Sequence, residues 1–219
     1  MQIAGALFDV DGLLVDSIPA WTTAQRALFE SMGGTWGPEI KAACMGLRVD
    51  EMAAVLVSLA GSDLAPAAAR ARLITDMTEL FAAGLPVRPG VPGLLDALGT
   101  AGVPLAVVSS SYRSLVEAAV AALGRERFAV LVAGDEVTAP KPDPGPYRLA
   151  ARRLGVDPAR CVVFEDSPKG VEAGAAAGCA VVAVPSLLPV APRTGVTVLA
   201  SLADVDVEWL LDRAVSADP

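Results

Sequence analysis

The sequence contains no histidine among its 219 residues. A chain without imidazole cannot build a Ser-His-Asp triad, form a phosphohistidine or hold a metal through histidine. Its three cysteines, Cys44, Cys161 and Cys179, are far apart and form no Cys-x-x-Cys pair, so neither a disulfide framework nor a zinc cluster is indicated. Any catalysis must therefore use carboxylates, lysine or hydroxyl groups, and the unpaired thiols fit a reducing, cytoplasmic location.

Positive charge is also scarce. The chain has 17 Lys and Arg against 25 Asp and Glu, a net charge of -8 and a pI near 4.6. A general nucleic-acid or anionic-membrane partner is not expected, because both require a basic face. With 53% hydrophobic and 19% charged residues, the chain is typical of a folded protein with one full domain and a smaller one. No coiled-coil heptads are seen, so a monomer is expected.

One stretch of 20 residues, 173–192, carries no charge and has the length of a membrane span. Gly174, Gly178, Pro185 and Pro189 interrupt it. These glycines and prolines predict the end of a helix, a buried strand and a proline-rich loop rather than a transmembrane helix.

Short apolar runs recur along the chain, and each ends in polar or turn-forming residues. The predicted strands are 3–8, 105–108, 130–133, 161–164 and 180–184, with predicted helices at 112–123, 144–154 and 169–177. This alternation is typical of the α/β class with a doubly wound parallel sheet. Ligands bind at the carboxyl ends of such strands, so Asp9, Ser109, Lys141 and Asp166 are expected around one crevice.

Residues 17–84 have a different pattern. Helical periodicity at 19–32, 50–60 and 66–83, without a convincing strand, predicts an inserted helical domain. The predicted catalytic core is therefore residues 1–16 together with 85–219. The segments 15–19 and 84–92 would carry the chain out of the core and back.

Asp9 and Asp11 stand two residues apart in Phe8-Asp9-Val10-Asp11-Gly12, at the end of the first predicted strand. Two such carboxylates suit phosphoryl transfer, because one can attack phosphorus while the other protonates the leaving oxygen and later activates water. The alternative is a simple turn, with aspartate at its start and Gly12 where the backbone needs freedom.

Glu165 and Asp166 follow the strand predicted at 161–164. Adjacent acids at a buried strand end are costly unless a positive group compensates them. Mg2+ prefers such oxygen ligands, and Asp9 and Asp166 would supply them with Glu165 in support. The alternative is that Asp166 or Ser167 caps the following helix.

Lys141 lies between two prolines in Ala139-Pro140-Lys141-Pro142, which stiffen the backbone and fix the direction of the side chain. Its ammonium could neutralise phosphate and the clustered carboxylates, although a loop lysine is usually solvated. The hydroxyl of Ser109 and nearby backbone N–H groups could hold phosphate oxygens, or the serine run could cap the next helix.

The segments FDVDGLLVDS, VVSSS, APKPDPGPY and VVFEDSPKGVEAGAAAG together resemble the four motifs of the haloacid dehalogenase-like superfamily, in residues, order and spacing over nearly the whole chain. The resemblance implies a Rossmann-like core, a helical cap at 17–84 and Mg2+ as cofactor. It also implies roles for individual residues: Asp9 as nucleophile, Asp11 as acid/base, Ser109, Ser110 and Lys141 as phosphate-binding groups, and Asp9, Asp11 (through its carbonyl), Glu165 and Asp166 around the metal.

Within that superfamily, Asp11 together with Glu165 and Asp166 favours phosphate chemistry over dehalogenation. The cap segments 17–21 and 45–50 look like those of hexitol and 2-deoxyglucose phosphate phosphatases, where Trp21 would stack on a sugar and Arg48 would contact the substrate. Core packing and a solvated surface charge are their ordinary alternatives. The expected activity is hydrolysis of small phosphate esters. A β-phosphoglucomutase-like isomerase is the alternative, although mutases usually place a histidine where Trp21 stands, and a non-catalytic binding protein of this fold fits less well.

Overall fold

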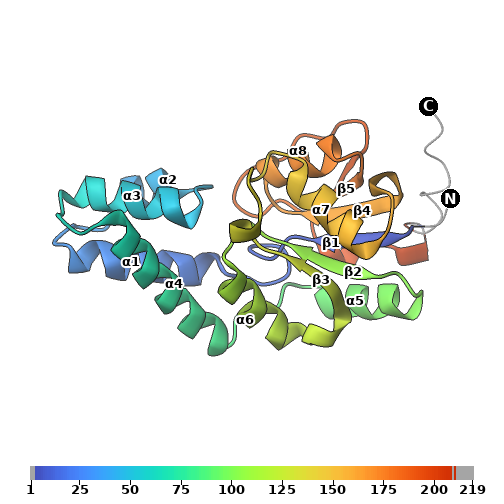
Figure 1. Cartoon of the computed structure of the whole chain (residues 1–219), viewed down its shortest axis with the longest axis horizontal. Helices are drawn as coiled ribbons and strands as arrows, with labels where there is room; N and C mark the ends of the chain where they lie inside the picture. The colour runs from blue at the N-terminus through green and yellow to red at the C-terminus, as the bar shows by residue number, and fades with distance from the viewer. Residues whose placement is uncertain (1–2, 209, 211–219) are drawn as a thin grey trace. The chain divides into compact units, whose positions relative to one another are not determined.

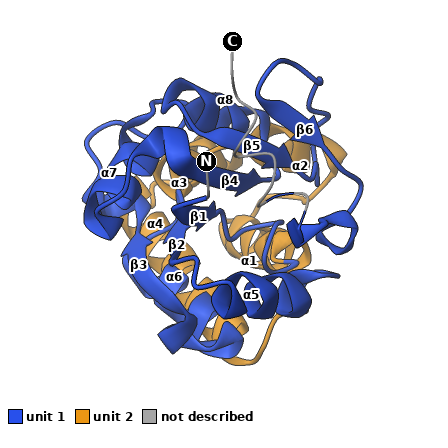
Figure 2. Ribbon diagram, turned by 90° about the vertical axis from the view of Figure 1, so that its right-hand side faces the viewer, with its two compact units in different colours: residues 1–16, 86–219 blue, residues 17–85 orange. Residues whose placement is uncertain are grey.

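The computed structural model describes residues 3–208 and 210, and divides them into two compact units. Unit 1 comprises residues up to Asp16 and from Pro86 onward, and unit 2 comprises Ser17–Leu85 (Figure 2). The two connecting segments pair within unit 1, where the Asp16 N–H donates to the Pro86 carbonyl (2.8 Å) and the Arg88 N–H donates to the Leu14 carbonyl (3.0 Å). The chain therefore leaves and re-enters unit 1 at one place.

Unit 1 is built on a parallel sheet of six strands in the order β3-β2-β1-β4-β5-β6. The strands are β1 (Gly5–Phe8), β2 (Leu105–Val108), β3 (Phe128–Val132), β4 (Cys161–Glu165), β5 (Ala180–Ala183) and β6 (Val196–Val198). Their apolar runs form strands because both faces of the sheet are buried. The predicted doubly wound α/β fold is confirmed.

Four helices of unit 1 cover the sheet, α7 (Gly145–Leu154) and α8 (Pro168–Ala176) on one face and α5 (Val91–Thr100) and α6 (Arg113–Leu123) on the other (Figures 1 and 2). Short 3-10 turns lie at Arg125–Arg127, Gly134–Glu136, Pro158–Arg160 and Leu202–Asp204. Helices switch faces between β1 and β4, which is where ligands bind in sheets of this kind.

Unit 2 contains the helices α1 (Ile18–Ser31), α2 (Pro38–Cys44), α3 (Val49–Ala60) and α4 (Pro66–Ala82). Leu28, Leu56, Leu73 and Met77 are buried to 1% exposure or less and form its core. Apolar residues one helical turn apart, such as Leu73 and Met77, explain why these segments pack as helices.

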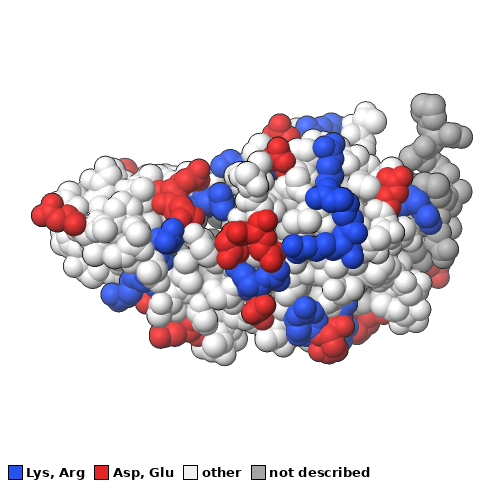
Figure 3. All heavy atoms as spheres, viewed as in Figure 1, with Lys and Arg blue, Asp and Glu red and all other residues white. Residues whose placement is uncertain are grey.

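The uncharged stretch 173–192 folds as predicted into the end of α8, the buried strand β5 and a loop. Among residues 3–208 and 210, no helix is long and apolar enough to cross a membrane. Figure 3 shows acidic and basic side chains interspersed on one face of the molecule. Some charged side chains form partly exposed ion pairs, such as Arg113 with Glu136.

Candidate active site

The alternation of side chains along β1 and β4 determines where the acidic residues point. Leu7 and Val163 belong to the core on the side of α7 and α8, so the next residues, Phe8 and Phe164, face the other side and stack at 4.6 Å between ring centroids. Glu165, the last residue of β4, returns to the side of α7 and α8. This parity places its carboxylate in the interior, where it is 0% exposed.

The Glu165 carboxylate accepts hydrogen bonds at both oxygens. Oε1 accepts from Lys141 Nζ (2.5 Å) and from the Tyr147 hydroxyl (2.7 Å). Oε2 accepts from the backbone N–H groups of Asp166 (3.0 Å) and Ser167 (3.1 Å) and from Ser167 Oγ (3.1 Å). Glu165 is thus already satisfied by protein donors. A Cβ at Gly170 would lie 1.8 Å from Oε1, so the start of α8 needs glycine to accommodate this carboxylate.

Lys141 lies in the interior with 5% of its side chain exposed. Its ammonium donates to Asp9 Oδ1 (2.7 Å), to Glu165 Oε1 (2.5 Å) and to the Val108 carbonyl (2.9 Å). An ammonium has three donors, so these acceptors fix its direction. The alternative of a solvated loop lysine does not hold.

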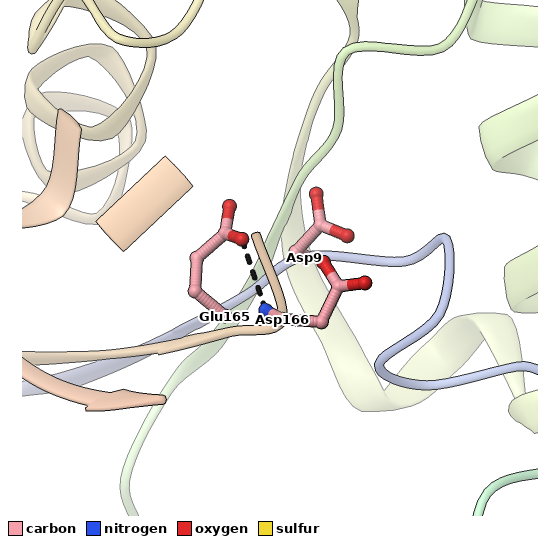
Figure 4. Close-up of side chains that lie close together, drawn as sticks. All are labelled: Asp9, Glu165 and Asp166. Atoms are coloured by element: carbon pink, nitrogen blue, oxygen red, sulfur yellow. Dashed lines mark hydrogen bonds between the residues drawn. The ribbon is translucent and has the colours of Figure 1, made fainter. Parts of the chain in front are cut away.

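Asp9, Glu165 and Asp166 each have a carboxylate oxygen within 4.8 Å of the others, and all three residues are buried. Figure 4 shows the carboxyl groups of Asp9 and Asp166 next to each other, with the Glu165 carboxyl group bonded to the backbone N–H of Asp166. Such a set of hard oxygen donors fits a divalent cation. Asp9 and Asp166 fit it better than Glu165, because the Glu165 oxygens are occupied by five donors.

Two neighbours restrict the Asp166 side chain. The Ser186 hydroxyl, just beyond β5, donates to Asp166 Oδ2. Gly12 has a φ of 84°, and a Cβ there would lie 2.3 Å from the same oxygen. Gly12 therefore serves the turn after Asp11 and also leaves room for Asp166. Ser167, not Asp166, caps α8, because its Oγ accepts from the Gly170 N–H (3.1 Å).

Asp11 lies beyond β1 and accepts a hydrogen bond at Oδ2 from the Ser111 hydroxyl (2.7 Å). Ser109 directly follows β2 and is buried to 3% exposure, and its Oγ accepts from the Ser111 N–H (3.0 Å). The capping alternative for Ser109 is wrong, because the N-cap of α6 is Tyr112. Ser110 lies between them and is half-buried.

Burial and mutual repulsion raise the pKa values of Asp9 and Asp166. Burial is the largest cause that raises the pKa of Asp9, and Glu165, Asp166 and Asp11 raise it further while Lys141 opposes them. Burial and the Glu165 charge raise the pKa of Asp166 to about 7, against a smaller lowering by the Ser186 hydrogen bond. Burial alone would lower the pKa of Lys141, but Asp9 and Glu165 outweigh it and keep the ammonium charged. Lys141 therefore does not compensate all the negative charge of the three clustered carboxylates.

This imbalance predicts how stability depends on pH. A carboxyl group whose pKa is raised on folding stabilises the fold when protonated, and that contribution is lost as pH rises through the folded-state pKa, about 7 for Asp166. In chelator-treated protein, Asp166→Asn should be more stable than wild type by about 1–3 kcal/mol at pH 8, with the gap closing towards pH 4. Urea unfolding of both proteins at the two pH values measures it.

Mg2+ at one thousand times its dissociation constant should reverse that order at pH 8, because a ligand that binds only the folded state stabilises it, here by about 4.1 kcal/mol. Wild type should gain this stability and Asp166→Asn should not. If the stability difference between Asp166→Asn and wild type in chelator-treated protein is the same at pH 4 and pH 8, the electrostatic explanation is wrong.

The two substrate residues predicted from the sequence, Trp21 and Arg48, belong to the helical unit. Trp21 is partly buried on α1. Arg48 is half-buried, is the N-cap residue of α3, and its backbone N–H donates to Glu51 Oε2 (3.0 Å). Their contact with substrate stays a prediction.

Sequence reasoning missed three side chains of the site: Tyr147, Ser111 and Ser186. Tyr147 and Ser111 stood within quoted motifs but carried no assigned role. Ser186 follows the strand end at Ala183, where a polar residue could have been suspected.

Residues 3–178 match the family model described as haloacid dehalogenase-like hydrolase. The chain belongs to this family. It is 35% identical over 188 residues to hexitol phosphatase A of Escherichia coli, covering 84% of each chain, and 36% identical over 217 residues to a probable pseudouridine-5'-phosphatase of Drosophila melanogaster, covering 94% of this chain and 93% of the relative.

A solved structure, CbbY from Rhodobacter sphaeroides in complex with phosphate, superposes with a TM-score of 0.83 at 32% identity, covering 92% of this chain and 96% of that one. The resemblance read from the four motifs is confirmed by the family match and these relatives. They also confirm that this member of the haloacid dehalogenase-like family is a phosphatase enzyme.

Proposed function

We propose that the chain is a Mg2+-dependent phosphatase that hydrolyses small phosphorylated metabolites, with sugar and polyol phosphates first among them, through an aspartyl-phosphate on Asp9. The observation that carries the proposal is the contact of Lys141 Nζ with Asp9 Oδ1 (2.7 Å), beside the buried Asp166 carboxylate. A buried nucleophile held against a cation, with a second carboxylate available for a metal, suits attack on a phosphate dianion.

In the first step a carboxylate oxygen of Asp9 attacks phosphorus. The bond between phosphorus and the ester oxygen breaks, and Asp11 gives its proton to the departing alkoxide. Asp11, now a carboxylate, then takes a proton from water, the water oxygen attacks the aspartyl-phosphate, and inorganic phosphate leaves with Asp9 restored. The hydrogen bond from the Ser111 hydroxyl to Asp11 Oδ2 (2.7 Å) supports this role, because it restrains the orientation of the Asp11 carboxyl group.

Lys141 neutralises phosphate charge in this mechanism, and Ser109 and Ser110 with the backbone after β2 hold the phosphate oxygens. Asp9 and Asp166, with the Asp11 carbonyl, would hold Mg2+. When bound, the ion neutralises the clustered carboxylates and the phosphate and so favours attack by an anion on an anion. Glu165 would support these residues by accepting a hydrogen bond from Lys141 and so fixing the position of the ammonium.

The helical unit Ser17–Leu85 is proposed as the cap that selects substrate, with Trp21 and Arg48 as its candidate contacts. The name of the hexitol phosphatase relative supports polyol phosphates, and that of the pseudouridine-5'-phosphatase relative extends the candidates to nucleoside phosphates. Trp21 suits either, because an aromatic ring packs on a sugar face or a base.

Release of phosphate from a panel of esters tests the proposal. The purified protein is incubated with hexose, hexitol, pentose and nucleoside monophosphates, with Mg2+ or with chelator, and inorganic phosphate is measured. We expect Mg2+-dependent release that is fastest for a sugar or polyol phosphate. Conversion of a hexose 1-phosphate into its 6-phosphate isomer without phosphate release would favour the mutase alternative, and neither product across the panel would overturn the proposal.

A further inference from the structure

We propose that Tyr147 is a positioning residue for the nucleophile, acting through Glu165 to hold the Lys141 ammonium against Asp9. The proposal rests on the proposed function and adds a residue that the four motifs left without a role. Tyr147 is 0% exposed and lies in the first turn of α7, six positions after Lys141 in the same segment. Both side chains therefore reach the site from one short stretch of chain, Lys141 from the loop before α7 and Tyr147 from the helix itself.

A continuous series of hydrogen bonds connects the tyrosine to the nucleophile. The Tyr147 hydroxyl donates to Glu165 Oε1 (2.7 Å), and the same oxygen accepts from Lys141 Nζ (2.5 Å). Lys141 Nζ in turn donates to Asp9 Oδ1 (2.7 Å). The ammonium also lies 4.9 Å from the centroid of the Tyr147 ring, so the ring face and the hydroxyl act on the same cation.

The two oxygens of the Glu165 carboxylate accept hydrogen bonds from different parts of the chain. Oε2 is held by backbone and side-chain donors of Asp166 and Ser167 and therefore belongs to the start of α8. Oε1 faces the site and, among the described residues, accepts from Tyr147 and Lys141 only. Tyr147 is thus the one group that fixes Oε1 independently of the lysine. Without it, the ammonium would be shared differently between Glu165 and Asp9.

Packing alone does not explain a tyrosine at this position. Its neighbours in the core on this face are apolar, among them Ala150, Val163 and Val171. A hydroxyl placed among such groups costs free energy unless it is hydrogen-bonded, and phenylalanine would fill the same volume without that cost. The hydroxyl is therefore explained by its contact with Glu165.

The decisive variant is Tyr147→Phe, which keeps the ring and removes only the hydroxyl. We expect kcat to fall about tenfold and KM to rise no more than about fivefold, because the substrate still binds but the nucleophile is less well held. In calorimetry, inorganic phosphate should bind about fivefold more weakly, since Lys141 is displaced, while the dissociation constant of Mg2+ stays the same.

Val171→Ala is the matched control, because it opens the same core without touching the hydrogen-bonded series. It should lower the unfolding temperature and leave kcat of the folded enzyme unchanged. If Tyr147→Phe retains kcat and phosphate affinity within twofold of wild type, Tyr147 only packs and the proposal fails. If it weakens Mg2+ binding as Asp166→Asn does, Tyr147 acts on the metal rather than on Lys141, and the proposal also fails.

The two binding measurements need no turnover, so they separate this proposal from the proposed function. A wild-type protein that binds Mg2+ and phosphate but hydrolyses no ester would contradict the phosphatase assignment alone. The comparison of phosphate affinity between wild type and Tyr147→Phe would then still decide the role of Tyr147.

Discussion

The Asp9→Asn protein is expected to release no measurable phosphate from any ester that the wild type hydrolyses, with kcat reduced by at least about 10,000-fold. The amide has almost the same volume as the carboxyl group but lacks an anionic oxygen that can attack phosphorus. The substitution also removes one acid from a buried group of three, so the fold should be at least as stable as that of the wild type. Phosphate-release assays and thermal unfolding measure both effects.

The proposed covalent step gives this experiment a second readout. Wild-type protein quenched during turnover should carry the mass of one phosphate on the peptide that contains Asp9, and Asp9→Asn should not. Asp63→Asn, at an exposed loop position of the helical unit, is the control for an Asp-to-Asn change as such. Turnover retained in Asp9→Asn would reject an aspartyl-phosphate on this residue.

Lys141→Met should have the second largest effect, on stability as well as activity. Lys141 is the one buried cation among the described residues, and its ammonium contacts two of the three clustered carboxylates. Methionine fills similar space without charge, so the acids lose their compensation. We expect a loss of about 3–5 kcal/mol in the free energy of unfolding of metal-free protein at pH 8, and a fall in kcat of about 1,000-fold.

A double-mutant cycle separates charge compensation from lost packing. Adding Asp9→Asn to Lys141→Met should recover part of the lost stability, because one of the uncompensated acids is removed. Lys41→Met, an exposed lysine on α2, should change stability by less than about 0.5 kcal/mol. If Lys141→Met is as stable as Lys41→Met, the buried ion pairs do not stabilise the site.

Much of the sheet could be predicted because its strands are buried on both faces and read as unbroken apolar runs. The run at 105–108 coincides with β2, whereas the first strand begins later than predicted, at Gly5. β6 was missed because it has three residues, two of them half-buried, and lies at the sheet edge. So short a segment gives too few positions for a periodicity.

Two helices were missed for related reasons. α2 is seven residues long with one buried side chain, Cys44, so it has little amphipathic pattern. α5 begins at Val91, inside the segment expected to be a hinge, and Pro92 in its first turn marks the start of a helix rather than a loop. The helical unit as observed, Ser17–Leu85, lies close to the interval 17–84 expected from the sequence.

The acidic residues of the site could be predicted because strand ends in a parallel sheet converge on one edge. Their environment could not. That Glu165 is saturated by five donors, or that Ser186 reaches Asp166, depends on side chains from α7, α8 and the loop after β5, whose packing no linear pattern records. Sequence reasoning placed Glu165 around the metal in support of Asp9 and Asp166. The hydrogen bonds of its carboxylate show in addition that it holds Lys141.

The position of β1 at the centre of the sheet affects synthesis of the protein. β1 is synthesised before the other five strands, but its neighbours in the sheet begin at Leu105 and Cys161. At 5–20 residues per second, on the order of ten to thirty seconds separates Asp9 from Asp166 in the growing chain. The helices of Ser17–Leu85 make local contacts and are synthesised before either neighbour of β1 in the sheet. A nascent chain thus carries Asp9 long before Lys141 and Asp166, the residues that lie against it in the folded protein.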